Sequence, residues 1–474
     1  MTETMQTPPP STAPAAPSDP VAPPAAATGA LTLRPGRWID GWDAEHPVQW
    51  EREGRRIARR NLNWSIFAEF LGFVVWQLWS IVAVALPAAG FQLSTGELFW
   101  LISIPSLVGA TLRIPYSFLV PIFGGRNWTI VSAALLLAPT IALAICVSNP
   151  GTPFGVLLFA AALAGFGGGN FASSMSNITF FYPQREKGWA LGLNAAGGNL
   201  GAAVAQFTVP IVITIGAGAT LNLPIAGLIW IPFILIAMFG AWKSMDNLSN
   251  AKADLSGSAA ALKEPHLWLL SLLYIGTFGS FIGFASVFPK LIADQFPEFS
   301  TIGVLGATVS LAFLGALVGS LARPYGGRLS DRFGGARITM VAFAAMAAIT
   351  VAVLATLPLG SFWLFLGLFL LLFATAGIGN GSTYRMVPIV FAMRSAHGGA
   401  GDVSTQRKAA AALGLISAIG AFGGFLIPQA LNLSFQTTGD YAAAFMGFIA
   451  GYVVLLALTW AVYVRPRHLR EQKI

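Results

Sequence analysis

The sequence predicts an all-α integral membrane protein with twelve transmembrane helices in two pseudo-symmetric six-helix bundles. Of its 474 residues, 55% are hydrophobic and 10% are charged, whereas soluble globular proteins carry roughly 25% charged residues. Eleven polar or glycine- and proline-containing breaks divide the apolar region, about residues 63–464, into twelve stretches of the roughly 20 residues that span a bilayer. This composition excludes a soluble enzyme, a disordered regulator and a nucleic-acid-binding protein.

The breaks divide the chain into six regions. Residues 1–35 are rich in proline and alanine and lack the basic start of a signal peptide, so a disordered tail is expected. A polar lead-in covers residues 36–62. The longest internal polar break, 243–265, is a linker between a six-helix bundle at 63–242 and a second one at 266–464. The last region is a polar tail, 465–474.

The basic residues predict the orientation in the membrane. Of the 27 lysines and arginines, all but Arg113, Lys290, Arg323 and Arg385 fall in the terminal segments or in the even-numbered loops. The outer loops contain only Lys290. Because loops rich in Lys and Arg remain in the cytoplasm, we expect both termini to be cytoplasmic and the protein to cross the lipid bilayer of the cell membrane.

The two halves of the chain repeat each other. LVGATLR (107–113) recurs as LVGSLAR (317–323), and Phe-Gly-Gly recurs at the same spacing of 210 residues. Two further pairs of short glycine-containing strings follow in the same order. The repeats predict an internal duplication, which in membrane proteins indicates a transporter with its site near the midplane. A duplicated channel or scaffold is the less favoured alternative.

Arg113 and Arg323 occupy equivalent positions in the two repeats, ten residues before each Phe-Gly-Gly. At 1.5 Å per residue they lie about 15 Å deep, near the centre of a roughly 30 Å hydrocarbon core, where a charge must be compensated. A structural ion pair is one explanation, but only Glu69 is placed clearly inside a span, near its cytoplasmic end. Two guanidinium groups without an acid beside them instead indicate an anion receptor.

The segment GGRLSDRFGGAR (326–337) resembles the signature loop of the major facilitator superfamily. The matching residues are Gly327, Asp331 and Arg332, and the resemblance implies the major facilitator fold with a cytoplasmic gate at this loop. The equivalent loop of the first half, PIFGGRNW (121–128), lacks the acid. Arg385 lies near the same side, where a gating role and a snorkelling interface residue are both open.

Longer stretches resemble the NarK-type nitrate/nitrite porter family within that superfamily. They include AGFGGGNFASSMSNITFFYP (164–183), GIGNGSTYRMVP (377–388) and WDAEHPVQWEREGRRIARRNL (42–62). The resemblance implies that a planar anion is held by two arginines, sandwiched by two aromatic rings and hydrogen-bonded by an amide and a phenol. These residues are, in that order, Arg113, Arg323, Phe171, Phe278, Asn199 and Tyr274.

Two stretches, 195–201 and 418–424, correspond to the two nitrate signature motifs of that family. Small residues allow helices to pack closely, and the signature glycines are Gly197, Gly198, Gly201, Gly420, Gly423 and Gly424. Ala421 stands in the second motif where Asn199 stands in the first. We therefore expect unequal helices, of which one is polar and the other serves close contact.

The expected function is transport of nitrate and nitrite by alternating access, as a monomer and without a metal, a cofactor or a catalytic residue. Exchange is favoured because two bare positive charges would oppose the return of an unloaded carrier, and because the spans hold few titratable groups. A proton-coupled nitrate symporter is the close alternative. A membrane nitrate sensor and a carrier for another anion are further alternatives; deletion of residues 1–35 should disable a sensor and spare a transporter.

Overall fold

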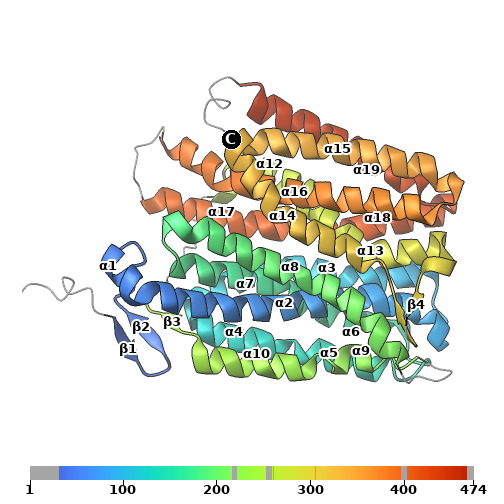
Figure 1. The fold of residues 1–474 in the computed structure, drawn as a ribbon, viewed down its shortest axis with the longest axis horizontal. Helices are drawn as coiled ribbons and strands as arrows, with labels where there is room; N and C mark the ends of the chain where they lie inside the picture. Colours follow the sequence, from blue (N-terminus) through green and yellow to red (C-terminus); the bar gives the residue numbers. More distant parts are fainter. Residues whose placement is uncertain are drawn as a thin grey trace, which may run out of the picture.

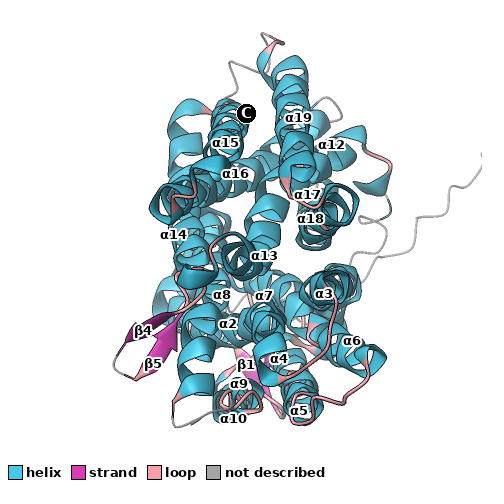
Figure 2. Cartoon of the chain, turned by 90° about the vertical axis from the view of Figure 1, so that its right-hand side faces the viewer, coloured by secondary structure: helices cyan, strands magenta, loops and turns pink. Residues whose placement is uncertain are grey.

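The protein is built almost entirely from long helices that run side by side (Figure 1). The structure, a computed structural model, describes residues 31–215, 221–251, 259, 261–304, 306–396 and 403–466, and for residues 392, 394–396 and 403–411 it describes the backbone alone. Two helical bundles lie against each other, one on either side of the linker in the sequence (Figure 2). This architecture confirms the predicted fold class.

The first bundle contains six spans, three of which are interrupted once. They are α2 (Arg55–Ala85), α3 (Thr95–Phe123), α4 with α5 (Gly125–Leu135 and Leu137–Cys146), α6 with α7 (Phe154–Leu163 and Gly165–Phe181), α8 (Gln184–Thr214) and α9 with α10 (Ile225–Leu228 and Ile231–Ser244). A short 3-10 turn, η3 (Pro87–Ala89), follows α2. Ser94 and Glu97 form a capping box that begins α3.

The second bundle contains the other six spans. They are α12 (Pro265–Tyr274) continued by the π-turn η4 (Ile275–Gly279) and α13 (Ser280–Gln295), then α14 (Phe313–Phe333), α15 (Gly335–Thr356), α16 (Phe362–Ala396), α17 with α18 (Val403–Ala421 and Gly423–Thr438) and α19 with η7 (Ala442–Thr459 and Trp460–Val464). The 3-10 turns η5 (Pro297–Phe299) and η6 (Leu357–Leu359) and the hairpin β4–β5 (Ile302–Val304 and Ala307–Val309) lie between spans.

Eleven of the twelve spans are long and apolar enough to cross a membrane. The exception is α14, whose mean hydropathy is lowered by Arg323 within it and by the polar residues of its last turns. Because α14 packs against α16 and α8 in the middle of the molecule, it takes the twelfth position in spite of its composition.

Single glycines make the two breaks that the sequence marks as loops. Gly124 separates α3 from α4 with a φ of 88°, and Gly334 separates α14 from α15 with a φ of 93°. Positive φ angles of this kind favour glycine. The predicted loop at 326–337 is therefore much shorter than expected. Asp331 and Arg332 belong to the last helical turn of α14, which extends to Phe333.

The lead-in is folded and joins the linker. Strands β1 (Thr32–Arg34) and β2 (Trp38–Asp40) pair antiparallel, and β2 pairs parallel with β3 (Asn247–Leu248), which follows α10. Helix α1 (Pro47–Gln49) and the π-turn η2 (Trp50–Gly54) continue into α2. Part of the region assigned to the disordered tail, β1, is thus a strand, whereas residues 1–30 lie outside the described residues.

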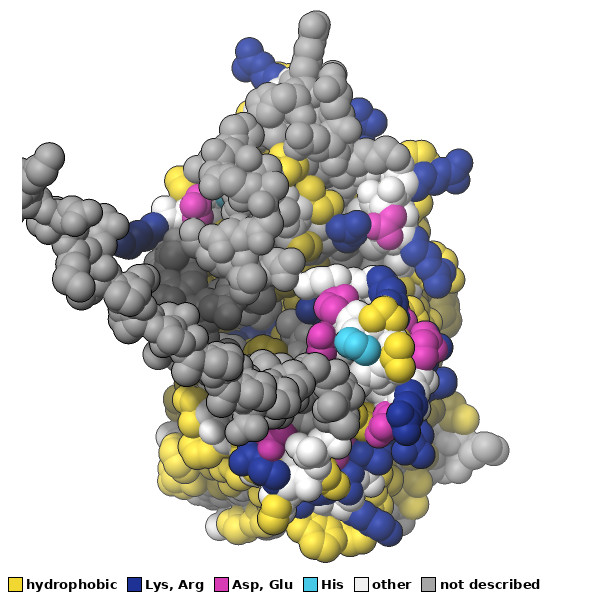
Figure 3. All heavy atoms as spheres, turned by 90° about the vertical axis from the view of Figure 1, so that its left-hand side faces the viewer, with side chains coloured by type: hydrophobic (Ala, Val, Ile, Leu, Met, Phe, Trp, Pro, Cys, Tyr) yellow, Lys and Arg dark blue, Asp and Glu magenta, His cyan; other side chains and the backbone are white. Residues whose placement is uncertain are grey.

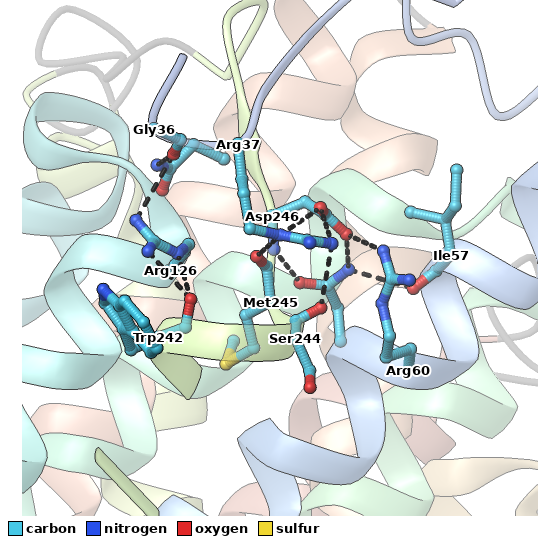
Figure 4. A network of polar contacts seen from close by, with 11 residues as sticks. Gly36, Arg37, Ile57, Arg60, Arg126, Trp242, Ser244, Met245 and Asp246 are labelled. Atoms are coloured by element: carbon cyan, nitrogen blue, oxygen red, sulfur yellow. Dashed lines mark hydrogen bonds and ion pairs between the residues drawn. The ribbon is translucent and has the colours of Figure 1, made fainter. Parts of the chain in front are cut away.

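Asp246 fixes the start of the linker to the first bundle (Figure 4). Its carboxylate is 1% exposed and accepts hydrogen bonds from Arg37 at 2.7 and 3.0 Å, from Arg60 at 2.6 Å and from Asn61 at 3.0 Å. Nearby, Arg126 at the start of α4 donates to the carbonyl oxygen of Trp242 at 2.8 and 3.0 Å. The charged groups of this network come from the lead-in, α2, α4 and the linker.

Lysine and arginine side chains gather at this end of the molecule, as Figure 3 shows. We call it the lead-in end, because β1, β2, β3 and α1 lie there (Figure 1). The opposite end contains the hairpin β4–β5 and the loops after α2 and α13.

Lys290 lies within a helix and not in an outer loop, which corrects the prediction. It belongs to α13, is 5% exposed and donates to both carboxylate oxygens of Asp294, at 2.6 and 2.8 Å. Its ammonium group also lies 5.5 Å from the ring centre of Phe99 in the first bundle. The helix extends to Gln295, further than the apolar run suggests, because this i, i+4 pair satisfies the charge.

The two bundles contact each other mainly towards the end opposite the lead-in. Side-chain hydrogen bonds that join them there are Gln429 to Ser103 at 2.7 Å, Gln77 to Ser286 at 3.2 Å and Gln206 to the carbonyl oxygen of Ala285 at 2.6 Å. Thr308 of the hairpin also donates to the carbonyl oxygen of Pro210 at 3.3 Å. The structure is therefore closed on that side of the molecule.

Candidate functional site

Arg113 lies in the middle of α3 and is fully buried between the two bundles. Its Nε donates to the carbonyl oxygen of Gly168 in the first bundle at 3.1 Å, and its Nη1 donates to that of Ser417 in the second at 2.9 Å. Its Nη2 has no partner within the described residues. The guanidinium group is thus held in place by backbone carbonyls while one of its nitrogens stays free for another acceptor.

Arg323 reaches the same region from α14 and is held more loosely. It is 5% exposed, and its Nη2 donates to the hydroxyl of Tyr274 at 3.4 Å, the limit of a hydrogen bond. Its Nη1 has no partner in the part of the chain that the structure describes. The two arginines of the repeat therefore both present an unused donor at the boundary between the bundles.

Two phenylalanines from different bundles face each other beside the arginines. The rings of Phe171 on α7 and Phe278 on η4 are fully buried, with centroids 6.2 Å apart and planes 25° apart. The guanidinium carbon of Arg113 lies 4.4 Å from the first ring centre and 5.0 Å from the second, and that of Arg323 lies 5.7 Å from the first. Both rings therefore contact the positive groups that the sequence predicts as anion ligands.

Tyr274 completes this group through the break in its helix. Its ring stacks on Phe278 with centroids 5.3 Å apart, and its hydroxyl accepts the bond from Arg323. The π-turn η4 follows directly after it, and such turns in long helices are frequent at functional sites. Arg113, Arg323, Phe171, Phe278 and Tyr274 are thus brought together as the sequence predicts.

Asn199 is the predicted site residue that no contact joins to the others. It lies on α8, is fully buried, and neither its amide nitrogen nor its oxygen has a partner within the described residues. A buried amide without partners is costly. Its two unsatisfied groups are therefore available to a ligand or to water, and its place in the site stays a prediction.

Comparison with known proteins identifies the family. The sequence profile of the Major Facilitator Superfamily matches residues 69–428. The nitrate/nitrite transporter NarU of Escherichia coli strain K12 is 44% identical over 450 residues, which cover 90% of this chain and 96% of that protein. The chain belongs to the NarK-type porters of the major facilitator superfamily.

Two further relatives of this porter are named for different modes of transport. The probable nitrate/nitrite antiporter NarK2 of Thermus thermophilus is 37% identical over 91% of this chain and 97% of that protein. The nitrite extrusion protein of Bacillus subtilis strain 168 is 30% identical over 82% of this chain and 91% of that protein. The porter therefore crosses the membrane several times, and its family membership agrees with the motifs in its sequence.

The signature glycines of the porter lie where helices touch. A Cβ added at Gly201 would overlap the carbonyl oxygen of Phe70 on α2, and one at Gly423 would overlap the Cα of Gly279 on η4. The other four glycines likewise face atoms too close for a side chain: Gly197 faces Ile66, Gly198 faces Glu69, Gly420 faces Tyr274 and Gly424 faces Ser106. The second motif thus packs directly against the turn that carries Phe278.

No carboxylate forms an ion pair with either site arginine in the described part of the porter, as the sequence predicts. Yet one buried acid acts on both. Glu69 on α2 is fully buried and interacts electrostatically with Arg323 and Arg113. The expectation that the arginines lack any counter-charge therefore holds at hydrogen-bonding distance and fails at longer range.

The predicted gate residues lie at the lead-in end of α14. Asp331 accepts a hydrogen bond from Nε of Arg385 on α16 at 2.7 Å, and both side chains are about half exposed. Arg332 lies with its guanidinium carbon 5.0 Å from the ring centre of Phe333. A Cβ at Gly327 would meet open space, whereas one at Gly326 would overlap the carbonyl oxygen of Ile378. The close approach of α14 to α16 therefore occurs at Gly326.

Sequence reasoning missed two aromatic residues of the site. The guanidinium carbon of Arg323 lies 5.5 Å from the ring centre of Tyr384, and that of Arg113 lies 5.3 Å from the ring of Trp76. Tyr384 could have been found, because it lies within the motif GIGNGSTYRMVP that carries the family resemblance. Trp76 is one of many aromatic residues in α2 and has no distinguishing pattern.

Proposed function

We propose that this porter exchanges nitrate for nitrite by alternating access around Arg113 and Arg323. One observation carries the proposal: each bundle supplies one buried arginine with an unused nitrogen, and both lie over the same phenylalanine ring. An anion that bridges them would neutralise two like charges and connect the two bundles. The names of the relatives, a nitrate/nitrite transporter and a probable nitrate/nitrite antiporter, support the same substrates.

The ring pair favours a planar anion. Two stacking contacts of about 3.5 Å each need ring planes about 7 Å apart, and the centroids of Phe171 and Phe278 are already 6.2 Å apart. Because the centroid distance is the upper limit of the distance between the ring planes, a planar trigonal ion would need at least about 0.8 Å of further separation. The faces of the rings are electron-rich and repel an anion, so the arginines supply the attraction while the rings select the shape.

The closed side of the structure suggests the access route. The bundles are joined at the end opposite the lead-in by Gln429, Gln77 and Gln206. If the lead-in end is cytoplasmic, as its basic residues indicate, this state is closed on the outer side of the membrane. Rocking of the bundles about the arginines would then open the opposite side.

Counterflow in proteoliposomes tests the exchange. We expect uptake of labelled nitrate to require nitrate or nitrite inside the vesicles, because an unloaded carrier keeps two unneutralised arginines at the bundle boundary. Phosphate inside should not replace them, because a tetrahedral ion lacks flat faces. Uptake at the same rate into vesicles without internal nitrate or nitrite would refute exchange. If the protein takes up no nitrate under any internal condition but does take up another anion, the substrate assignment is refuted.

A further inference from the structure

Glu69, within α2, is a buried acidic group that anion exchange does not use. Its Oε2 accepts a hydrogen bond from Asn194 on α8 at 2.7 Å, and the same amide nitrogen donates to Ser174 on α7 at 2.6 Å. Its Oε1 is buried and has no partner within the described residues. A carboxylate with an oxygen lacking a donor is costly to bury; a proton on that oxygen would remove the charge.

A small polar cavity lies directly beside this carboxyl group. Its lining combines one carboxyl, one amide and several hydroxyl groups from α2, α4 and α7: Ser65, Ala68, Glu69, Thr129, Ser132, Asn170, Ser173 and Ser174. Asn170 is 2% exposed, and neither its amide nitrogen nor its oxygen has a partner within the described residues. The cavity is about the size that one water molecule needs, and it offers such a water several polar partners.

The surroundings of Glu69 favour a proton over a metal cation. A cation would suit the oxygens of the cavity, but the unpartnered amide of Asn170 brings a donor as well as an acceptor. Asn194 likewise directs its amide hydrogens at the carboxyl group. A neutral carboxyl group and a water molecule satisfy both kinds of group, whereas a cation would leave the donors facing a positive charge.

The charged and titratable groups that act on Glu69 come from the binding site itself. They are Arg113 on α3, Arg323 on α14 and Tyr384 on α16, whereas α4, α7 and α8 present neutral hydroxyl and amide groups. A carboxylate and a bound anion compete for the field of the same two arginines. Proton binding at Glu69 should therefore strengthen anion binding, and anion binding should strengthen proton binding to the same extent.

We propose that Glu69 and the adjoining polar cavity form a proton-binding site, and that its proton is a second ligand bound together with the anion. This inference rests on the proposed anion site. When the anion binds, one proton adds to Oε1 of Glu69, and it leaves when the anion leaves, so the net charge of the site does not change. In exchange, one proton accompanies nitrate in one direction and another accompanies nitrite in the other, without net proton flux.

Nitrate binding to the purified full-length protein at several pH values tests the coupling. We expect the affinity of the wild-type protein to fall by up to tenfold for each pH unit, because one proton is linked to one anion. Glu69→Gln should bind nitrate with the low-pH affinity of the wild type at every pH. A pH indicator in weak buffer should show proton uptake on nitrate addition for the wild type and none for Glu69→Gln. Glu97→Gln, which removes a carboxylate at the opposite end, is the matched control and should behave as wild type.

Infrared spectroscopy in the absence of nitrate tests the proton site independently of the anion site. A protonated carboxyl group gives a carbonyl stretching band, and we expect a band that titrates with pH in the wild-type protein and is missing from Glu69→Gln. Absence of this band from the wild type would overturn the proton site, whatever the result with nitrate. Presence of the band in a protein that does not bind nitrate would instead overturn the anion site. Proton uptake retained in Glu69→Gln would assign the linked proton to another group.

Discussion

The two bundles differ in how they hold their charged groups. Arg113 in the first bundle has two hydrogen bonds to backbone carbonyls, one of them across the boundary, whereas Arg323 in the second has one long bond to a phenol. Asp246 near the first bundle is buried among three donors, whereas Asp331 in the second is more than half exposed. In both comparisons the group in or near the first bundle is more deeply buried and has more hydrogen-bond partners than the group in the second.

The two site arginines, Arg113 and Arg323, give the largest expected effect, which is on nitrate affinity. Replacement by lysine retains the charge and removes the planar fork, so Arg113→Lys should weaken nitrate binding about 100-fold, a loss of about 2.7 kcal/mol in binding free energy. Arg323→Lys should lose only about tenfold, because it gives up a single weak hydrogen bond to the protein. Calorimetric titration of both variants measures the difference. Equal losses would show that the backbone contacts of Arg113 do not contribute to anion binding.

The two aspartates at the lead-in end give the next largest difference, in stability. Asp246→Ala removes the carboxylate that pairs with Arg37 and Arg60, both about one third exposed, and should lower the free energy of unfolding by about 2 kcal/mol. Asp331→Ala breaks an exposed pair and should cost less than about 1 kcal/mol. Thermal unfolding in detergent compares them. A larger loss for Asp331→Ala would show that the burial of Asp246 does not determine its contribution to stability.

The last comparison concerns the two signature motifs and nitrate affinity. The first motif has Asn199 where the second has Ala421. Asn199→Ala should weaken nitrate binding about tenfold, because it removes one hydrogen bond from an amide to the anion, worth about 1.5 kcal/mol. The control is Asn177→Ala, because that amide already donates to Ser65 at 3.3 Å; it should leave the affinity unchanged. Unchanged nitrate affinity in Asn199→Ala would show that Asn199 does not bind the anion. The two motifs would then be alike in contributing no polar side chain at this position.

Much of this architecture could be predicted from sequence. Apolar runs locate most spans because the bilayer requires a fixed length of apolar residues, and the repeat places Arg113 and Arg323 at equal depth before any coordinates are known. The meeting of Phe171, Phe278 and Tyr274 with them follows from family resemblance. These features depend on local composition or on a motif, which a single sequence records.

Other features depend on contacts between distant residues and leave no local pattern. Trp38 pairs with Asn247, and Arg37 bonds to Asp246, across more than 200 residues. The sequence predicts a loop position for Lys290, whereas the structure shows it buried beside Asp294 and the ring of Phe99. The sequence places Glu69 near the cytoplasmic end of its span. Its electrostatic interaction with Arg113 and Arg323 depends on the packing of α2 against α7 and α8, which no local pattern records.

The strand pairing at the lead-in end also determines where the connection between the bundles begins. After β3, Ser249 donates to the carbonyl oxygen of Ile39 at 2.9 Å, and Asn250 donates to that of Trp42 at 2.7 Å. The first eight residues of the region 243–265 therefore move as part of the first bundle. The connection between the bundles is therefore about a third shorter than the polar stretch in the sequence suggests.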